Sequence, residues 1–360
     1  KMKKFLKILA ILIVILIIIG IVSFFILKNW YEKSLNPVET ESRIVQVEIT
    51  KNMSTDKISK LLEEEKIINN QLSFKIYVKL HKINNLQAGK YEFEIGKDNV
   101  EKVVAKLSNG EIVRETIKIS FIEGKTLEDY AKTIAEKTNN TEQDVYDLLK
   151  DEEYIDSLIE KYWFLTDEIK SEDLYYSLEG YFKPDTYEFE NEDVSVKYIF
   201  NYVLNYTEKF LNQYKEEIEN ANLTVHQILA LASVVELEGK TDEDRSGIAG
   251  VFFNRINAKM SLGSDVTTYY AFHVKMGDSD LTKKQINTYN PYNTRGPNME
   301  GKLPVGPISN PSESAIKAVL NPQESDNYYF VSDKTGKAYF TKNYAEHQKV
   351  TQDLKDKGLW

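Results

Sequence analysis

The chain has 360 residues, which is enough for two or three domains of ordinary size. Hydrophobic residues make up 42% of it and charged residues 28%, so a largely disordered or collagen-like protein is excluded. The net charge of −10 argues against nucleic acid as a partner, and the lack of cysteine excludes disulfides, iron–sulfur clusters and thiol catalysis.

The N-terminal segment is the most apolar part of the chain. Residues 8–27 read ILAILIVILIIIGIVSFFIL, and as a helix they would span about 30 Å, the thickness of a bilayer's hydrocarbon core. The apolar region of a cleavable signal peptide is shorter, about 7–15 residues, and ends at small residues, whereas Lys28 follows here. We therefore predict that residues 1–28 form a cytoplasmic tip and a retained, single-pass membrane helix. Lysines before the run predict a cytoplasmic N-terminus and an extracytoplasmic remainder at the cell membrane.

Two predicted segments follow the membrane helix. Residues 29–43 are polar, contain Pro37 and are predicted to be a linker. Residues 44–115 are predicted to form a small α+β module, because short runs of strand and helix periodicity alternate there. The elements predicted in this module are a strand near 44–49 and helices near 58–62, 72–80 and 100–107.

The remaining residues, 116–360, are predicted to form a mixed α+β domain that carries the chemistry. Residues 140–220 are largely helical in pattern, but Pro184-Asp185 makes a helix through 178–189 improbable. The loops between 261 and 311 are long, and long ordered loops are often functional.

Most kinds of catalytic site lack support in this sequence. The four histidines have no partner at the spacing of metal ligands, so we predict no metal and no cofactor. The sequence contains no G-x-S-x-G elbow, phosphate loop or G-x-G-x-x-G motif. A carboxylate-based site that acts on a polymer such as a glycan is what remains.

One apolar helix carries two glutamates at its end. Thr224 and Gln227 form a capping-box pattern, and the helix should run to Gly239 with apolar residues on every face. Glu236 and Glu238 lie in its last turn. Desolvation and the negative end of the helix dipole both disfavour an ionised carboxyl there, and so raise its pKa as a general acid requires. The pattern alone does not choose between the two.

Several blocks of residues stand in one order along the chain. They are Leu178–Tyr181 with Pro184–Tyr187, Ala232–Glu238, Ile248–Arg255, Pro291–Thr294, Leu303–Ile308 with Asn310-Pro311, Tyr328–Val331, and Glu346-His347. In these blocks and their order the sequence resembles the YceG-like endolytic murein transglycosylases, and Ala232–Glu238 is similar to the signature helix of that family.

Some loop residues depart from the family pattern. Gly263 stands where the family has Gln, Val266 and Val305 stand where it has Pro, and Arg295 stands where it has Tyr. These departures leave the signature helix intact and bear on contacts with the glycan.

The resemblance implies both an architecture and an activity. It implies a membrane helix, a LysM-like module at 44–115 and a YceG-like catalytic domain at 116–360. The implied reaction cuts the β-1,4 bond between N-acetylmuramic acid and N-acetylglucosamine inside peptidoglycan strands. It uses no water and leaves a 1,6-anhydromuramic end, which terminates the glycan strand.

The resemblance also assigns roles to residues. Glu236 is the catalytic residue, first as the acid and then as the base for the sugar's own C6 hydroxyl. Glu238 is expected to brace the site beside the substrate, and Glu179 and Asp185 fit roles as loop braces. The residues expected to contact the glycan are Asp265, Thr267, Tyr292, Asn293 and Thr294.

Two other functions fit the same sequence. The first is a hydrolytic muramidase that uses Glu236 together with Glu238 or Asp265, which would need to lie about 5–9.5 Å apart. The second is a membrane-anchored scaffold that binds peptidoglycan without cutting it. Cell-wall synthases and division or elongation proteins are candidate partners.

Overall fold

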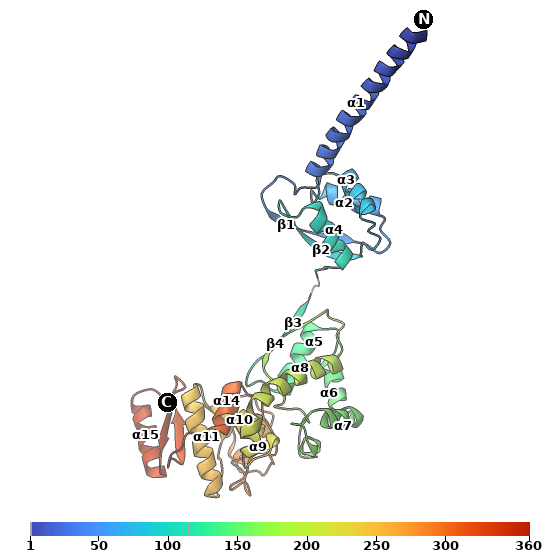
Figure 1. Ribbon diagram of the computed structural model, residues 1–360. Coiled ribbons are helices and arrows are strands. Elements are labelled where there is room, and N and C mark those ends of the chain that lie inside the picture. Colours follow the sequence, from blue (N-terminus) through green and yellow to red (C-terminus); the bar gives the residue numbers. More distant parts are fainter. Residues whose placement is uncertain (1, 114–115) are drawn as a thin grey trace. The chain divides into compact units, whose positions relative to one another are not determined.

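The computed structural model describes residues 2–113 and 116–360, and mixes helices with short strands, as predicted (Figure 1). The chain divides into two compact units, Lys1–Glu115 and Thr116–Trp360. Each unit buries its own cluster of hydrophobic side chains.

The chain begins with the long helix α1, Met2–Ser34. Of the residues that the structure describes, those of α1 alone form a helix long and apolar enough to cross a membrane. The helix continues beyond the apolar run, with an ion pair of 3.7 Å between Lys28 and Glu32 one turn apart. The first residues of the predicted linker are therefore helical, and the irregular stretch is 35–42.

The rest of the first unit contains the predicted strand and the three predicted helices, together with a second strand, β2, that was not predicted. Strands β1 and β2 pair antiparallel, from Arg43 opposite Ile95 to Ile49 opposite Gly89. Alternate residues of both strands face inward and pack on α2, α3 and α4. These elements are β1 Arg43–Ile49, α2 Thr55–Glu64, α3 Gln71–Leu80, β2 Gly89–Ile95 and α4 Val100–Asn109.

The second unit opens with a two-stranded sheet and a layer of helices. Strand β3 pairs antiparallel with β4, which starts at Asp185, directly after the proline that was predicted to interrupt the helices. The elements of this half are β3 Ile117–Phe121, α5 Leu127–Lys137, α6 Glu142–Leu149, α7 Glu152–Lys161, the 3-10 turn Asp167–Lys170, β4 Asp185–Phe189, α8 Val196–Leu211, the 3-10 turn Asn212–Tyr214 and α9 Lys215–Asn220.

The C-terminal half of this unit is built around α10, whose predicted bounds are confirmed. Thr224 and Gln227 form the capping box, and Gly239 is the C-cap. The elements are α10 Val225–Glu238, α11 Asp242–Asn257, α12 Asp265–Ala271, α13 Lys283–Ile286, α14 Glu313–Leu320, β5 Tyr329–Ser332, β6 Ala338–Thr341 and α15 Tyr344–Asp356.

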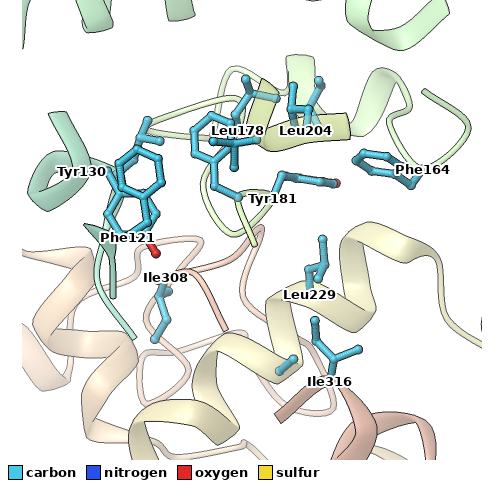
Figure 2. Close-up of a cluster of buried hydrophobic side chains, with 14 of the residues drawn as sticks. Phe121, Tyr130, Phe164, Leu178, Tyr181, Leu204, Leu229, Ile308 and Ile316 are labelled. Atoms are coloured by element: carbon cyan, nitrogen blue, oxygen red, sulfur yellow. The ribbon is translucent and has the colours of Figure 1, made fainter. Parts of the chain in front are cut away.

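Helix α10 lies inside the unit because its apolar residues cover all its faces. Every residue from 228 to 235 is buried, and α10 packs against α11, α12 and α14. Figure 2 shows Leu229 of α10 beside Ile316 of α14, in a cluster that extends to Phe121 and Tyr130. Close packing also restricts α11, since a Cβ on Gly250 would overlap the carbonyl oxygen of Gln323.

Separate cores predict separate unfolding transitions. Phe74 is fully buried in the first unit, so Phe74→Ala should cost about 3–5 kcal/mol and lower the melting temperature of that unit. Calorimetry of Phe74→Ala should show the transition of the second unit unchanged. Phe200→Ala, which lies in the second unit, should shift only the transition of that unit. A single transition that both variants shift equally would contradict this prediction.

Candidate active site

The carboxyl of Glu236 is held at the end of α10 by a cation and a hydroxyl group. Arg245 Nη2 of α11 donates to Oε1 at 2.9 Å, and the two side chains are only 14% and 7% exposed. Ser312 donates to Oε2 through its backbone N–H at 3.1 Å and through its hydroxyl. Ser312 is also the N-cap of α14, so the positive end of that helix dipole faces the carboxyl.

Glu238 has a different surrounding. Ser264 donates to its Oε1 at 2.6 Å from the loop before α12. Burial raises the pKa of Glu238 and the negative charge of Asp265 adds to this, while the bond from Ser264 and the charges of Arg295 and Arg255 oppose it. The sequence predicted that burial raises the pKa of a carboxyl at this helix end, and Glu238 shows this rise.

The two glutamates point away from each other. Residues two positions apart on an α-helix do not share a face, because each step turns the side chain by about 100°. Glu236 accordingly meets α11 and the start of α14, and Glu238 meets the loop at Ser264. The bonding partners of Glu236 in the described chain, Arg245 and Ser312, are not carboxylates.

Four of the residues expected to contact a glycan are buried. Tyr292, Asn293, Thr294 and Thr267 are fully buried. Their polar groups bond to protein: the hydroxyls of Thr267 and Thr294 lie 2.8 Å apart, and Tyr292 accepts a bond from the backbone N–H of Tyr175 at 3.2 Å. Asn293 accepts from Thr268 at 2.7 Å and donates to the carbonyls of 285, 286 and 288.

Asp265 differs from those four because its side chain is 58% exposed, and it lies beside two of the departures from the family pattern. Arg295 Nη1 contacts Asp265 Oδ1 at 2.8 Å and donates to the carbonyl of Gly263 at 3.0 Å. The departures at 263 and 295 therefore form one contact. Val266 is buried, and Val305 packs against the core while its carbonyl bonds to His226.

Glu179 is a second buried carboxyl near the site, with 1% of its surface exposed. Its oxygens accept from the backbone N–H of Leu127 at 2.9 and 3.0 Å, from Asn310 Nδ2 at 3.2 Å and from Tyr270 at 3.2 Å. Burial raises the pKa of Glu179 to about 8, and the bonds from Leu127 and Tyr270 offset this only in part. Asp185, the other expected brace, accepts locally from Lys183 and Thr186.

An open cavity of about 360 Å³ begins beside the end of α10, and Gly124, Leu237 and Ile308 are among the residues that line it. Gly124 has a φ of +71°, and a Cβ there would lie 3.3 Å from Leu237 Cδ2 and 3.6 Å from Glu236 Cγ. Gly124 and Leu237 therefore line the cavity and also lie next to Glu236.

Sequence reasoning missed the partners of the acidic groups. Arg245 is nine residues from Glu236, and Ser312 is 76 residues away. Two signals in the sequence pointed to this region: Asn310-Pro311 stood in a matching block, and Ser312 before Glu313 has the pattern of an N-cap. Neither signal indicates that Ser312 contacts Glu236.

Most of the chain is similar to known proteins. The model of the YceG-like family matches residues 47–353. The endolytic murein transglycosylase of Bacillus subtilis (strain 168) is 33% identical over 89% of this chain and 88% of its own length. That of Streptococcus pneumoniae serotype 2 (strain D39) is 32% identical over 88% of this chain, which spans 59% of that longer protein. The crystal structure of a YceG-like protein from Listeria monocytogenes is 35% identical, with a TM-score of 0.61 over 86% of this chain and 100% of that one.

The raised pKa of Glu179 predicts a pH dependence of stability. The folded protein holds this proton more tightly than the unfolded chain, so the stabilisation is full below pH 4.5, the ordinary pKa, and falls as the pH rises to about 8. The slope is at most about 1.4 kcal/mol per pH unit. Glu179→Gln should remove this slope when free energies of unfolding are measured between pH 5 and 8.

Asp333→Asn is the matched control for that measurement. Hydrogen bonds from Thr335 and Tyr339 hold the pKa of Asp333 below its ordinary value, so this group contributes only in acid. The control should keep the slope between pH 5 and 8. Equal slopes in the wild type and Glu179→Gln would contradict the prediction.

Proposed function

Since this chain belongs to the YceG-like family and is a peptidoglycan-cleaving transglycosylase, we propose that Glu236 is its single acid and base. The observation that carries the proposal is the setting of Glu236. It lies in the last turn of the matched signature helix, next to Leu237, which lines the cavity, and its bonding partners in the described chain are Arg245 and Ser312.

The proposed reaction has two proton transfers at one carboxyl. In its acid form Glu236 protonates the glycosidic oxygen, which leaves with the electron pair of the broken C1–O bond. The resulting carboxylate takes the proton of the C6 hydroxyl as that oxygen bonds to C1 and closes the 1,6-anhydro ring. Glu236 regains its proton and no water is consumed.

The contacts around Glu236 suit the stage of the reaction between the two proton transfers. After it has given up its proton, its negative charge faces the guanidinium of Arg245 and the N-terminus of α14 at Ser312. A muramidase needs a second carboxylate across the sugar. Glu238 faces the other side of α10, and Asp265 is paired with Arg295, so the arrangement favours the one-carboxylate reaction.

We assign the glycan contacts by exposure. Asp265 presents its carboxylate outward and is the residue we propose to contact the sugar directly. The buried Thr267, Tyr292, Asn293 and Thr294 hold the loops that carry it, and Glu238 braces the same loops through Ser264.

The first unit fits a LysM-like, glycan-holding role. Its two antiparallel strands are separated in sequence by two helices, the order β1–α2–α3–β2. We propose that α1 anchors the protein with its lysine-rich end in the cytoplasm, so that the rest of the first unit and the second unit act outside. Cell-wall synthases and division or elongation proteins are the partners we propose for an enzyme so placed.

Glu236→Gln tests the assignment directly. The amide keeps the shape but cannot donate and reclaim a proton, so cutting should fall by roughly 10²–10⁴-fold. Mass spectrometry of products from purified glycan strands should show anhydro ends from the wild type, lighter than a hydrolysis product by one water. Near-normal cutting by this variant, or reducing ends from the wild type, would refute the assignment.

Glu238→Gln is the matched control, because it makes the same exchange on the other side of the helix and should lose less activity. Glu236→Gln also leaves the largely buried Arg245 with only the exposed Asp242, 3.8 Å away, as a charge partner, which should cost roughly 3 kcal/mol. Both variants should therefore be assayed below their melting temperatures, with activity expressed per folded protein.

The role of the first unit is tested by removing it. A protein of residues 116–360 should bind isolated cell walls less tightly than residues 35–360, while cutting short soluble strands at a similar rate. Pull-down with isolated walls gives the binding and product release gives the rate. Equal binding by the two proteins would show that the first unit does not hold glycan.

A further inference from the structure

The buried carboxyl of Glu179 joins three separate segments of the second unit. Its partners are the first residue of α5 (Leu127), a residue of α12 (Tyr270) and a loop residue ahead of α14 (Asn310). All three act as donors to Glu179. A carboxyl group at this depth is costly to bury, and its contacts in the described chain include no cation.

Two of these segments are also bonded to each other. The backbone N–H of Gly124 donates to the carbonyl of Asn310 at 2.9 Å, and the backbone N–H of Asn310 donates to the carbonyl of Lys125 at 2.9 Å. Asn310 Nδ2, which bonds to Glu179, also donates to the carbonyl of Lys125 at 3.1 Å. Glu179 therefore closes a network that fixes the turn at 124–127 against the segment 310–312.

The same two segments lie beside the side chain of Glu236, the proposed catalytic residue. Gly124 lies close to Glu236, since a Cβ added to Gly124 would be 3.6 Å from Glu236 Cγ. Ser312, two residues after Asn310, donates twice to Glu236 Oε2. A shift of either segment would move the atoms that orient Glu236.

We propose that Glu179 is a positioning residue of the transglycosylase reaction, which holds the turn at Gly124 and the segment Asn310–Ser312 in the arrangement that aims Glu236. This inference rests on the proposed role of Glu236. Glu179 itself is buried and touches no reacting atom, so it acts through its neighbours. Displacement of a catalytic group by about 1 Å can cost on the order of 10²-fold in rate, so such positioning is measurable.

The side chain must accept hydrogen bonds, and this requirement defines the variants. Glu179→Gln keeps an acceptor oxygen of the same reach for Leu127 and Asn310, and its amide can donate to the Tyr270 oxygen. Glu179→Leu has a similar size but removes the acceptor that all three partners share. In the full-length protein with glycan strands as substrate, we expect kcat of Glu179→Leu to fall by on the order of 10²-fold, with KM changed by less than about threefold.

Glu179→Gln should restore kcat to within about tenfold of the wild type. Asp333→Leu is the matched control, because Asp333 is a buried carboxyl with bonds from Thr335, Lys337 and Tyr339, all in the β5–β6 hairpin. This control should lower the melting temperature and leave kcat per folded protein unchanged.

Three outcomes would overturn the inference: a kcat of folded Glu179→Leu equal to that of Asp333→Leu, a loss confined to KM, or no rescue by Glu179→Gln. If Glu179→Leu does not fold, Glu179→Asp decides, since its shorter side chain cannot reach all three partners. Its kcat should fall by about tenfold, and a wild-type value would reject the proposal.

Glu236→Gln, assayed in parallel, separates the two proposals. Activity of that variant would refute the proposed function whatever Glu179 does. An inactive Glu236→Gln together with a wild-type kcat in folded Glu179→Leu would refute only the positioning role.

Discussion

The second unit depends on burying a helix that ends in two acidic side chains. Helix α10 is apolar on all its faces, so neighbours must surround it, and α11, α12 and α14 do so. A buried carboxyl is tolerated only with partners. The neighbours that cover α10 supply them: Arg245 from α11 and Ser312 from α14 for Glu236, and Ser264 from the loop before α12 for Glu238. The segments that pack around α10 are therefore also the segments that hold its two glutamates.

This arrangement also explains how the loops accommodate their departures from the family pattern. Arg295 contacts both the main-chain carbonyl of Gly263 and the carboxylate of Asp265, so this changed residue ties together the loop that carries 263 and 265. The pair is exposed, and an exposed ion pair contributes little to stability. Its consequence is positional, because it sets the direction of the Asp265 carboxylate that we propose to meet the glycan.

Glu236 and Glu238 at the end of α10 suggested one of two cases. Either both act in the reaction, or one acts and the other holds the surrounding loops in place. Helical geometry separates these cases, since side chains two residues apart lie on different faces. Glu236 lies between a cation and a helix N-terminus, and Glu238 lies against the hydroxyl of Ser264. The charge that forms on a general acid after proton transfer is better accommodated at Glu236, which supports a reaction that requires one carboxyl.

The sequence by itself determined the structural features that depend on residues close together along the chain. The capping box at Thr224, the break at Pro184 and the small α+β module before residue 115 are local hydrogen-bonding and periodicity effects, and the structure has them. The end of α1 at Ser34 was missed, because polar residues can extend a helix as well as a linker. Only the tertiary structure decided which groups meet Glu236 and Glu179. Ser312 is 76 residues from Glu236, and Asn310 is 131 from Glu179, so no local pattern encodes these contacts. They exist because burying α10 brings distant segments to its last turn.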